Sequence, residues 1–205
     1  MLFPYKDDNP RVLVPYVTYG IIAINVLVFI FQFNLGMSNP MGEENIIYRF
    51  GFVPANFSFI AIFTSMFLHG GFSHIMGNMW FLWVFGDNVE GVLGHAKYAL
   101  FYILCGLAAT ISQLLINPGS TIPMVGASGA IAGVLGMYMI RFPNANVHVF
   151  AFIIIFFTTF RIPALFVLGF WFFNQLTNGL TSLGFDTTGG AVSYTHLTLP
   201  TILLV

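Results

Sequence analysis

Residues 73–89, SHIMGNMWFLWVFGDNV, form an apolar segment that also carries a histidine and an asparagine. Roughly 20 mainly apolar residues, each rising about 1.5 Å, cross a bilayer as a helix. His74 and Asn78 are four residues apart and therefore share one face of such a helix. Both side chains can donate hydrogen bonds, so together they could stabilise an oxyanion. Spacing alone leaves a second interpretation open, in which they only join neighbouring helices.

The composition of the whole chain places it in a membrane. Of its 205 residues, 58% are hydrophobic and only 6% are charged, whereas a soluble domain carries about 25% charged residues. Most of the surface must therefore face lipid, and we predict an all-α membrane protein. A single cysteine, Cys105, excludes an internal disulfide framework and a cysteine-based metal site. No basic stripe suggests nucleic acid as a partner.

Further apolar stretches complete a predicted bundle of membrane-spanning helices. One more apolar run, Val147–Phe160, ends before Arg161 and Pro163 and precedes the fifth span. Ser73–Val89 is the second of six predicted spans. The first is Pro15–Phe33, and the third to the fifth are Tyr98–Ile116, Ala127–Ile140 and Ala164–Leu180. A sixth begins near Gly190.

The distribution of Lys and Arg predicts the orientation, because cytoplasmic loops carry an excess of both. With a cytoplasmic N-terminus, Arg49 alone faces outward. The longest connection, Asn34–Ile60, would then be an outer loop, and its mixed composition suggests that it is partly immersed in the interface. The residues that would face the cytoplasm are Lys6, Arg11, Lys97, Arg141 and Arg161.

A candidate nucleophile opens the fourth span, in the sequence GASGA at 126–130. We expect Ser128 at a helix N-terminus, where free backbone N–H groups and the helix dipole favour negative charge. Gly129 and Gly133 form a small-xxx-small face that lets another helix approach closely. The alternative is that Ser128 is only an N-cap on a helix whose glycines serve packing.

A serine nucleophile needs a base, and five histidines could supply it. His95 and His148 fall on the predicted cytoplasmic side, whereas a sixth span entering from outside would bring His196 to the level of Ser128. No Asp or Glu lies deep in a span, so a Ser–His dyad is predicted. His69 and His74 are five residues apart and are expected to point in different directions, which argues against a metal pair.

Two motifs, in this order and at this separation, resemble the rhomboid family of intramembrane serine proteases. They are FTSMFLHGGFSHIMGNMWFLWVFGDNVEGVLGHAKY at 63–98 and GASGAIAGVLGMY at 126–138. The resemblance extends from about Asn9 to Gly190. It implies a six-helix transmembrane bundle and a serine endopeptidase without a cofactor. Its substrates would be transmembrane proteins, cleaved within or beside the bilayer, and a bacterial plasma membrane is expected.

The resemblance also implies roles for individual residues. Ser128 matches the nucleophile, and His74 and Asn78 match the side chains that line the oxyanion site. Gly126 and Gly129 match the glycines that flank the nucleophile. Glu90 matches a structural acid after the second span. The oligomeric state does not follow from the resemblance.

The C-terminal stretch departs from the family pattern. Gly189-Gly190, five residues and then His196 reproduce the spacing of the catalytic histidine, but no glycines follow and Pro200 interrupts the span. The sequence VSYTHLTLPT at 192–201 resembles a translated sequencing adapter. We therefore expect a transmembrane domain over residues 1–190 and an artefactual tail over 191–205, in which His196 stands at the catalytic position by coincidence.

Two other functions remain open from the sequence. One is a catalytically inactive rhomboid-like protein that binds transmembrane clients. The other is a small transporter or channel, which would require polar groups along a path through several spans; here the polar groups gather toward one side.

Overall fold

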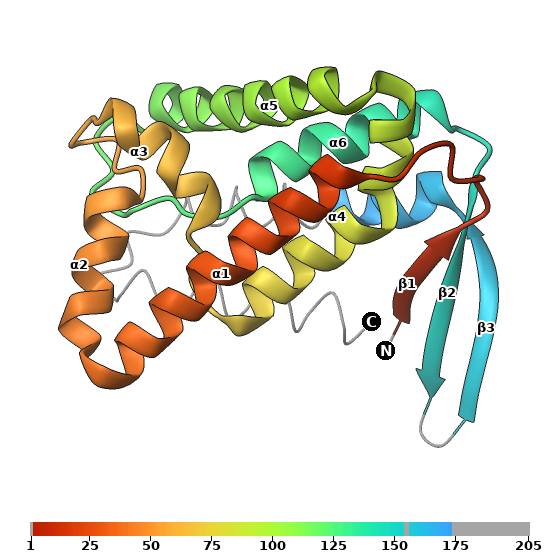
Figure 1. Cartoon of the computed structure of the whole chain (residues 1–205), viewed down its shortest axis with the longest axis horizontal. Helices are drawn as coiled ribbons and strands as arrows, with labels where there is room; N and C mark the ends of the chain where they lie inside the picture. Colours follow the sequence, from red (N-terminus) through yellow and green to blue (C-terminus); the bar gives the residue numbers. More distant parts are fainter. Residues whose placement is uncertain (1, 154–155, 174–205) are drawn as a thin grey trace.

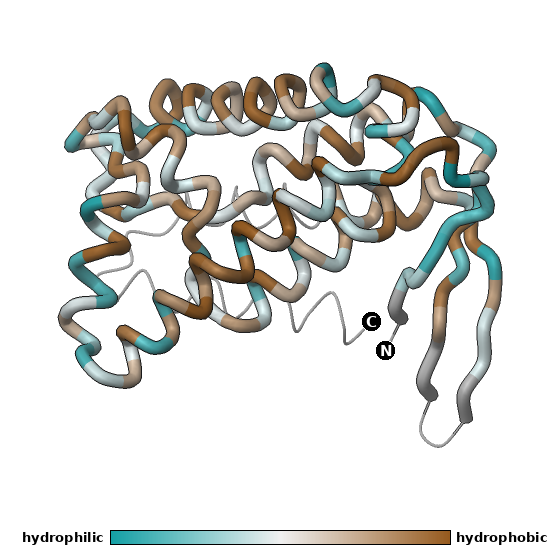
Figure 2. Tube along the Cα trace, viewed as in Figure 1, coloured by the Kyte–Doolittle hydropathy of each residue, from teal (hydrophilic) through white to brown (hydrophobic). Residues whose placement is uncertain are grey.

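The computed structural model describes residues 2–153 and 156–173, and shows a bundle of helices with a small sheet at one end (Figure 1). Hydrophobic residues predominate along the helices, whereas many of the hydrophilic ones gather at the two ends of the bundle (Figure 2). That distribution suits a bundle that crosses a bilayer, with its ends in the interfaces.

Within the described part of the chain, two helices are long and apolar enough to cross a membrane, α1 (Tyr16–Ser38) and α5 (His95–Ile116). A third candidate span is bent by 84°, where α3 (Phe59–Thr64) and the 3-10 turn η1 (Ser65–Phe67) meet α4 (Phe72–Leu93). The predicted helical membrane bundle is confirmed. A helix also begins at Ala164 as expected and is described to Phe173, while the sixth span lies outside the described residues.

The predicted outer loop at Asn34–Ile60 is more ordered than expected. Helix α1 continues to Ser38, and a separate helix α2 (Pro40–Phe50) follows. Asn39 explains the break, because its side chain caps α2 by accepting a hydrogen bond from Gly42 N at 3.1 Å, and Pro40 occupies the first turn. None of the residues of α2 is fully buried, which fits an interfacial position.

Helix α6 (Ser128–Arg141) is the buried centre of the bundle and packs against both α5 and α4 (Figure 1). Its inward side chains Ile131, Val134 and Leu135 are completely buried. One face of α6 is thus buried against α5 and α4, and its position in the bundle is determined by these protein contacts.

The predicted small-xxx-small face is confirmed at the contact between α6 and α5. A Cβ placed on Gly129 would lie 2.4 Å from the Ala109 Cβ, and one on Gly133 would lie 2.2 Å from the Cys105 Sγ. The two helices can therefore approach this closely only because both positions lack a side chain.

The apolar run at 147–160 forms strands, which the sequence analysis did not predict. The strands are β1 (Leu2–Asp7), β2 (Asn146–Ile153) and β3 (Phe156–Pro163), in one antiparallel sheet of order β1-β2-β3. Val147 and Val149 of β2 are buried in the core of the bundle. The Ala164 N–H, at the start of the next helix, donates to the Ala145 carbonyl just before β2 at 2.8 Å. The sheet therefore leads directly into that helix.

Glu90, near the end of α4, holds the start of α1. Its buried carboxylate accepts hydrogen bonds from Val17 N at 3.0 Å, from Thr18 N at 2.8 Å and from the Thr18 hydroxyl at 2.7 Å, and it contacts the His95 ring. These N–H groups belong to the first turn of α1, where no backbone acceptor is available. The arrangement is that of a structural acid.

The glycine contact between α5 and α6 gives a matched pair of variants. Gly133→Ala should lower the free energy of unfolding by about 1–3 kcal/mol, because the new methyl group overlaps Cys105. Gly136 lies on the same helix, and no atom of the described residues is within 4 Å of its Cβ position. Gly136→Ala should therefore raise the free energy of unfolding by up to about 1 kcal/mol through helix propensity. Unfolding in mixed micelles measures both, and equal effects would contradict the close packing.

Candidate active site

Ser128 is the first residue of α6, as expected, and its side chain is half-buried. Ala127 occupies the N-cap position, and the first helical hydrogen bond runs from Ile131 N to the Ala127 carbonyl at 3.0 Å. The alternative that Ser128 is only an N-cap is therefore wrong. The free N–H groups of the first turn lie around Ser128, where they favour an anion.

His74 and Asn78 of α4 both lie against the backbone just before Ser128. A Cβ on Gly126 would lie 2.7 Å from His74 Cε1, 2.8 Å from His74 Nε2 and 3.6 Å from Asn78 Nδ2. The four-residue spacing thus does bring the two side chains to one place. The structure brings together three predicted site residues, two on α4 and one in the loop before α6, which are far apart in the sequence.

Gly126 is required here for two physical reasons. Its φ of +120° is strained for residues with a side chain, and the space for a side chain is filled by the His74 ring. Its N–H donates to the Ser65 carbonyl at 2.8 Å. Two residues earlier, Met124 and Phe52 exchange backbone hydrogen bonds of 3.0 and 2.8 Å. The loop before Ser128 is therefore anchored to the segment around η1.

Asn78 holds a donor that the described part of the chain does not use. The residue is buried, 7% exposed, and its Nδ2 has no hydrogen-bond partner there. A buried donor left without an acceptor costs about 1–3 kcal/mol. Because Nδ2 can only donate, an acceptor such as a substrate oxygen beside Gly126 would relieve this cost.

His69 belongs to the same neighbourhood, which the sequence analysis missed. We expected His69 and His74 to point in different directions, and this is wrong, because their ring centroids are 5.1 Å apart in an edge-to-face arrangement. The His69 ring is buried, and Gln32 of α1 brackets its backbone, accepting from His69 N at 3.0 Å and donating to the His69 carbonyl at 3.3 Å. The bend between η1 and α4 creates this contact, and spacing on a straight helix cannot reveal it.

The remaining predicted site residues are distributed differently. Gly129 lies one residue after Ser128 and faces Ala109 of α5, so its part in the structure is packing. His196, with Gly189 and Gly190, lies outside the described residues. Over 2–153 and 156–173, no three His, Cys, Asp or Glu side chains are placed to share a metal ion.

The Gly126 contact can be tested against a second glycine of the same loop. Gly126→Ala should lower the free energy of unfolding by about 1–3 kcal/mol, because it strains the backbone and displaces His74. Gly119→Ala should have little effect, because within residues 2–153 and 156–173 no atom lies within 4 Å of the Gly119 Cβ position. Unfolding in mixed micelles compares the two, and a Gly126→Ala protein as stable as the Gly119→Ala protein would refute the contact.

Comparison of the sequence with known proteins identifies the family. Residues 56–197, well over half of the chain, match the family model described as the Rhomboid domain. The chain is 30% identical to the mitochondrial Rhomboid protein 1 of Saccharomyces cerevisiae over 73% of its own length and 42% of that protein. It is 31% identical to the Putative rhomboid protease YdcA of Bacillus subtilis, over 64% of this chain and 66% of that protein.

A further relative is the Rhomboid protease GluP of Bacillus subtilis, 31% identical over 60% of this chain and 24% of that protein. The chain thus spans less than two thirds of these relatives, and only about a quarter of the last. The matched region contains the bent span, the buried α6 and the Gly126 contact. The chain belongs to the rhomboid family.

Proposed function

We propose that this protein is an intramembrane serine endopeptidase that cleaves transmembrane protein substrates. The observation that carries the proposal is the convergence of His74 and Asn78 on Gly126, two residues before Ser128 at the N-terminus of α6. A relative with 31% identity is named a rhomboid protease. A serine, helix N–H groups and two side-chain donors at one place are the elements that acyl transfer needs.

The proposed reaction proceeds through an acyl-enzyme. The Ser128 Oγ attacks the scissile carbonyl while a histidine accepts its proton. The Ser128 N–H and the side chains of Asn78 and His74 hold the oxyanion. The histidine then protonates the leaving amine, and water hydrolyses the ester formed on Ser128.

The base of this reaction is proposed from spacing alone. His196 follows Gly189-Gly190 by the interval of the family's catalytic histidine, and the family match extends to residue 197. We assign the transmembrane domain to residues 1–190 and retain residues 191–205 as a doubtful tail. If that tail is artefactual, the native histidine at this position takes the role of His196.

The substrate and the orientation follow from the same arrangement. α6 ends at Arg141 beside the sheet, which also contains the N-terminal strand, so Ser128 lies toward the opposite end of the bundle. A cytoplasmic N-terminus in a bacterial plasma membrane would place Ser128 toward the outer side. Only a segment that reaches this level within the bilayer could be cut, which favours transmembrane substrates.

Replacing the nucleophile is the direct test of the proposed activity. Ser128→Ala should reduce cleavage of a model transmembrane substrate in proteoliposomes to background, because no other oxygen takes the place of Oγ. Ser112→Ala is a matched control, since Ser112 lies exposed on α5 and bonds only its own helix, at the Ala108 carbonyl. Undiminished cleavage by Ser128→Ala would refute the assignment. A wild-type protein that binds the substrate but never cuts it would favour the inactive alternative.

The oxyanion role of Asn78 predicts a loss in kcat rather than in binding. Asn78→Ala should lower kcat about 10²–10³-fold with little change in KM. Asn88→Ala is the control, because this buried asparagine of α4 bonds Asp7 and Asp87, and its loss should affect stability instead. Equal losses of kcat in the two variants would show that Asn78 is only structural.

A further inference from the structure

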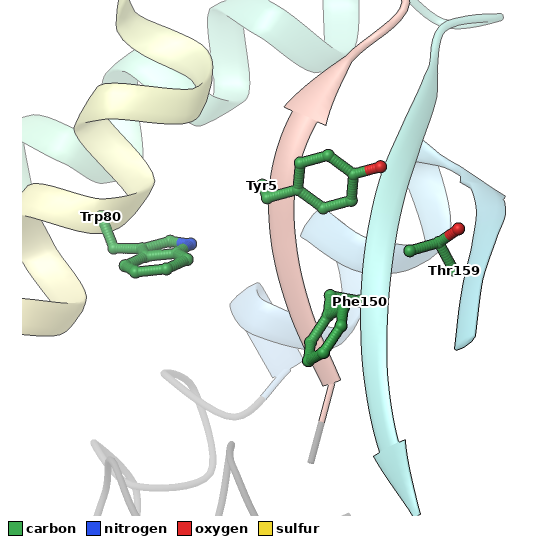
Figure 3. A pocket seen from close by; sticks show the side chains of 4 residues that line it. All are labelled: Tyr5, Trp80, Phe150 and Thr159. Atoms are coloured by element: carbon green, nitrogen blue, oxygen red, sulfur yellow. The ribbon is translucent and has the colours of Figure 1, made fainter. Parts of the chain in front are cut away.

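A second pocket lies beside the sheet, and none of its residues belongs to the proposed active site. Its volume is about 360 Å³, and the described residues that line it are Tyr5 of β1, Trp80 of α4, Phe150 of β2 and Thr159 of β3. Figure 3 shows Trp80 projecting from α4 toward the sheet, with Tyr5 and Phe150 beside it on the first two strands. We call this pocket the aromatic slot.

The aromatic slot is built by the register of the sheet. Successive residues of a strand point to opposite faces, and Val147 and Val149 are buried in the bundle core, so His148 and Phe150 lie on the other face. Phe150 pairs with Thr159 across β2 and β3. The Trp80 indole N–H donates to the Pro4 carbonyl at 2.5 Å, which fixes α4 against β1 at the slot.

Positive side chains occupy the same face of the sheet, next to the slot. Lys6 and Arg161 are the two cross-strand partners of His148, and both are exposed. The Tyr5 ring meets the His148 ring edge-on, with centroids 5.9 Å apart, so the cationic row adjoins the aromatic residues directly.

One carboxylate partly offsets this charge. Asp8 pairs with His148 and lies 4.0 Å from Arg161. The hydrogen bond from His148 lowers the pKa of Asp8, against the raising effect of its partial desolvation, so Asp8 stays negative at neutral pH. Lys6 has no ion-pair partner within the described part of the chain. The cationic row therefore keeps a positive charge, at Lys6, that can attract an anion.

We propose that the aromatic slot and its cationic row bind a phospholipid with an anionic head group. One acyl chain lies along Trp80, Tyr5 and Phe150, and the phosphate lies near Lys6 and Arg161. Trp80 and its neighbour Trp83 are 41% and 54% exposed on a candidate membrane span, so the slot adjoins the bilayer hydrocarbon. Only a molecule with a long apolar part reaches it from there, and basic residues at a membrane surface favour anionic lipids.

The test uses the fluorescence of Trp80, because lipids brominated on their acyl chains quench a tryptophan that they touch. The variant Trp83→Phe with Trp171→Phe leaves Trp80 as the only tryptophan of the chain. In phosphatidylcholine vesicles, brominated phosphatidylglycerol should reach half-quenching at a mole fraction about threefold lower than brominated phosphatidylcholine requires. The difference in quenching between wild type and Trp80→Phe gives the same information if the double variant does not fold.

Two controls separate a built site from the general contact with lipid. Trp83 lies on the same helix and stacks on Tyr19 with centroids 5.4 Å apart; in the variant Trp80→Phe with Trp171→Phe it should be quenched equally by both lipids. Lys6→Gln with Arg161→Gln should abolish the preference at Trp80 and leave quenching by phosphatidylcholine unchanged. Two results would overturn the proposal. One is equal quenching of Trp80 by both lipids in the protein that retains Lys6 and Arg161. The other is a preference for phosphatidylglycerol that persists after both cations are replaced.

Discussion

The packing of α6 against α4 and α5 is the constraint on which the arrangement of the site depends. Its 14 residues span only about 21 Å, less than the roughly 30 Å of bilayer hydrocarbon. A helix this short, packed against two longer helices, can begin below the membrane surface. Ser128 stands at that beginning, where α4 supplies His74 and Asn78 and the Gly126 backbone leaves room for both. The glycine contacts with α5 hold α6 in place, so the position of the proposed nucleophile depends on this close approach.

Most of the membrane spans could be predicted from the sequence, because length and apolarity are strong signals in a bilayer. The ends of helices were less accurate, and α1 runs five residues beyond its predicted end at Phe33. The strands at 146–163 could not be predicted, since an unbroken apolar run has no period that separates a buried strand from a helix. The pairing partner of β2 is also distant, because β1 lies at the opposite end of the chain.

The candidate site divides in the same way. Helical spacing and the small residues around Ser128 are local signals, so His74, Asn78 and Gly126 could be named in advance. His69 reaches His74 only because the chain bends before α4. Ser65 and Phe52 take part through backbone hydrogen bonds to the loop before α6, and their side-chain types give no signal of this. Glu90 was expected to be structural from the family resemblance, and its three hydrogen bonds at the start of α1, with its contact to His95 of α5, supply the physical reason.

The central claim is that Ser128 is an activated nucleophile. A fluorophosphonate reacts with an activated serine and leaves an adduct that mass spectrometry can assign to one residue. On the protein reconstituted in lipid, the account predicts a single adduct on the peptide that contains Ser128, and no adduct when the protein is unfolded beforehand. A reconstituted, folded protein that carries no adduct on Ser128, at probe concentrations that label other serine hydrolases, would contradict it.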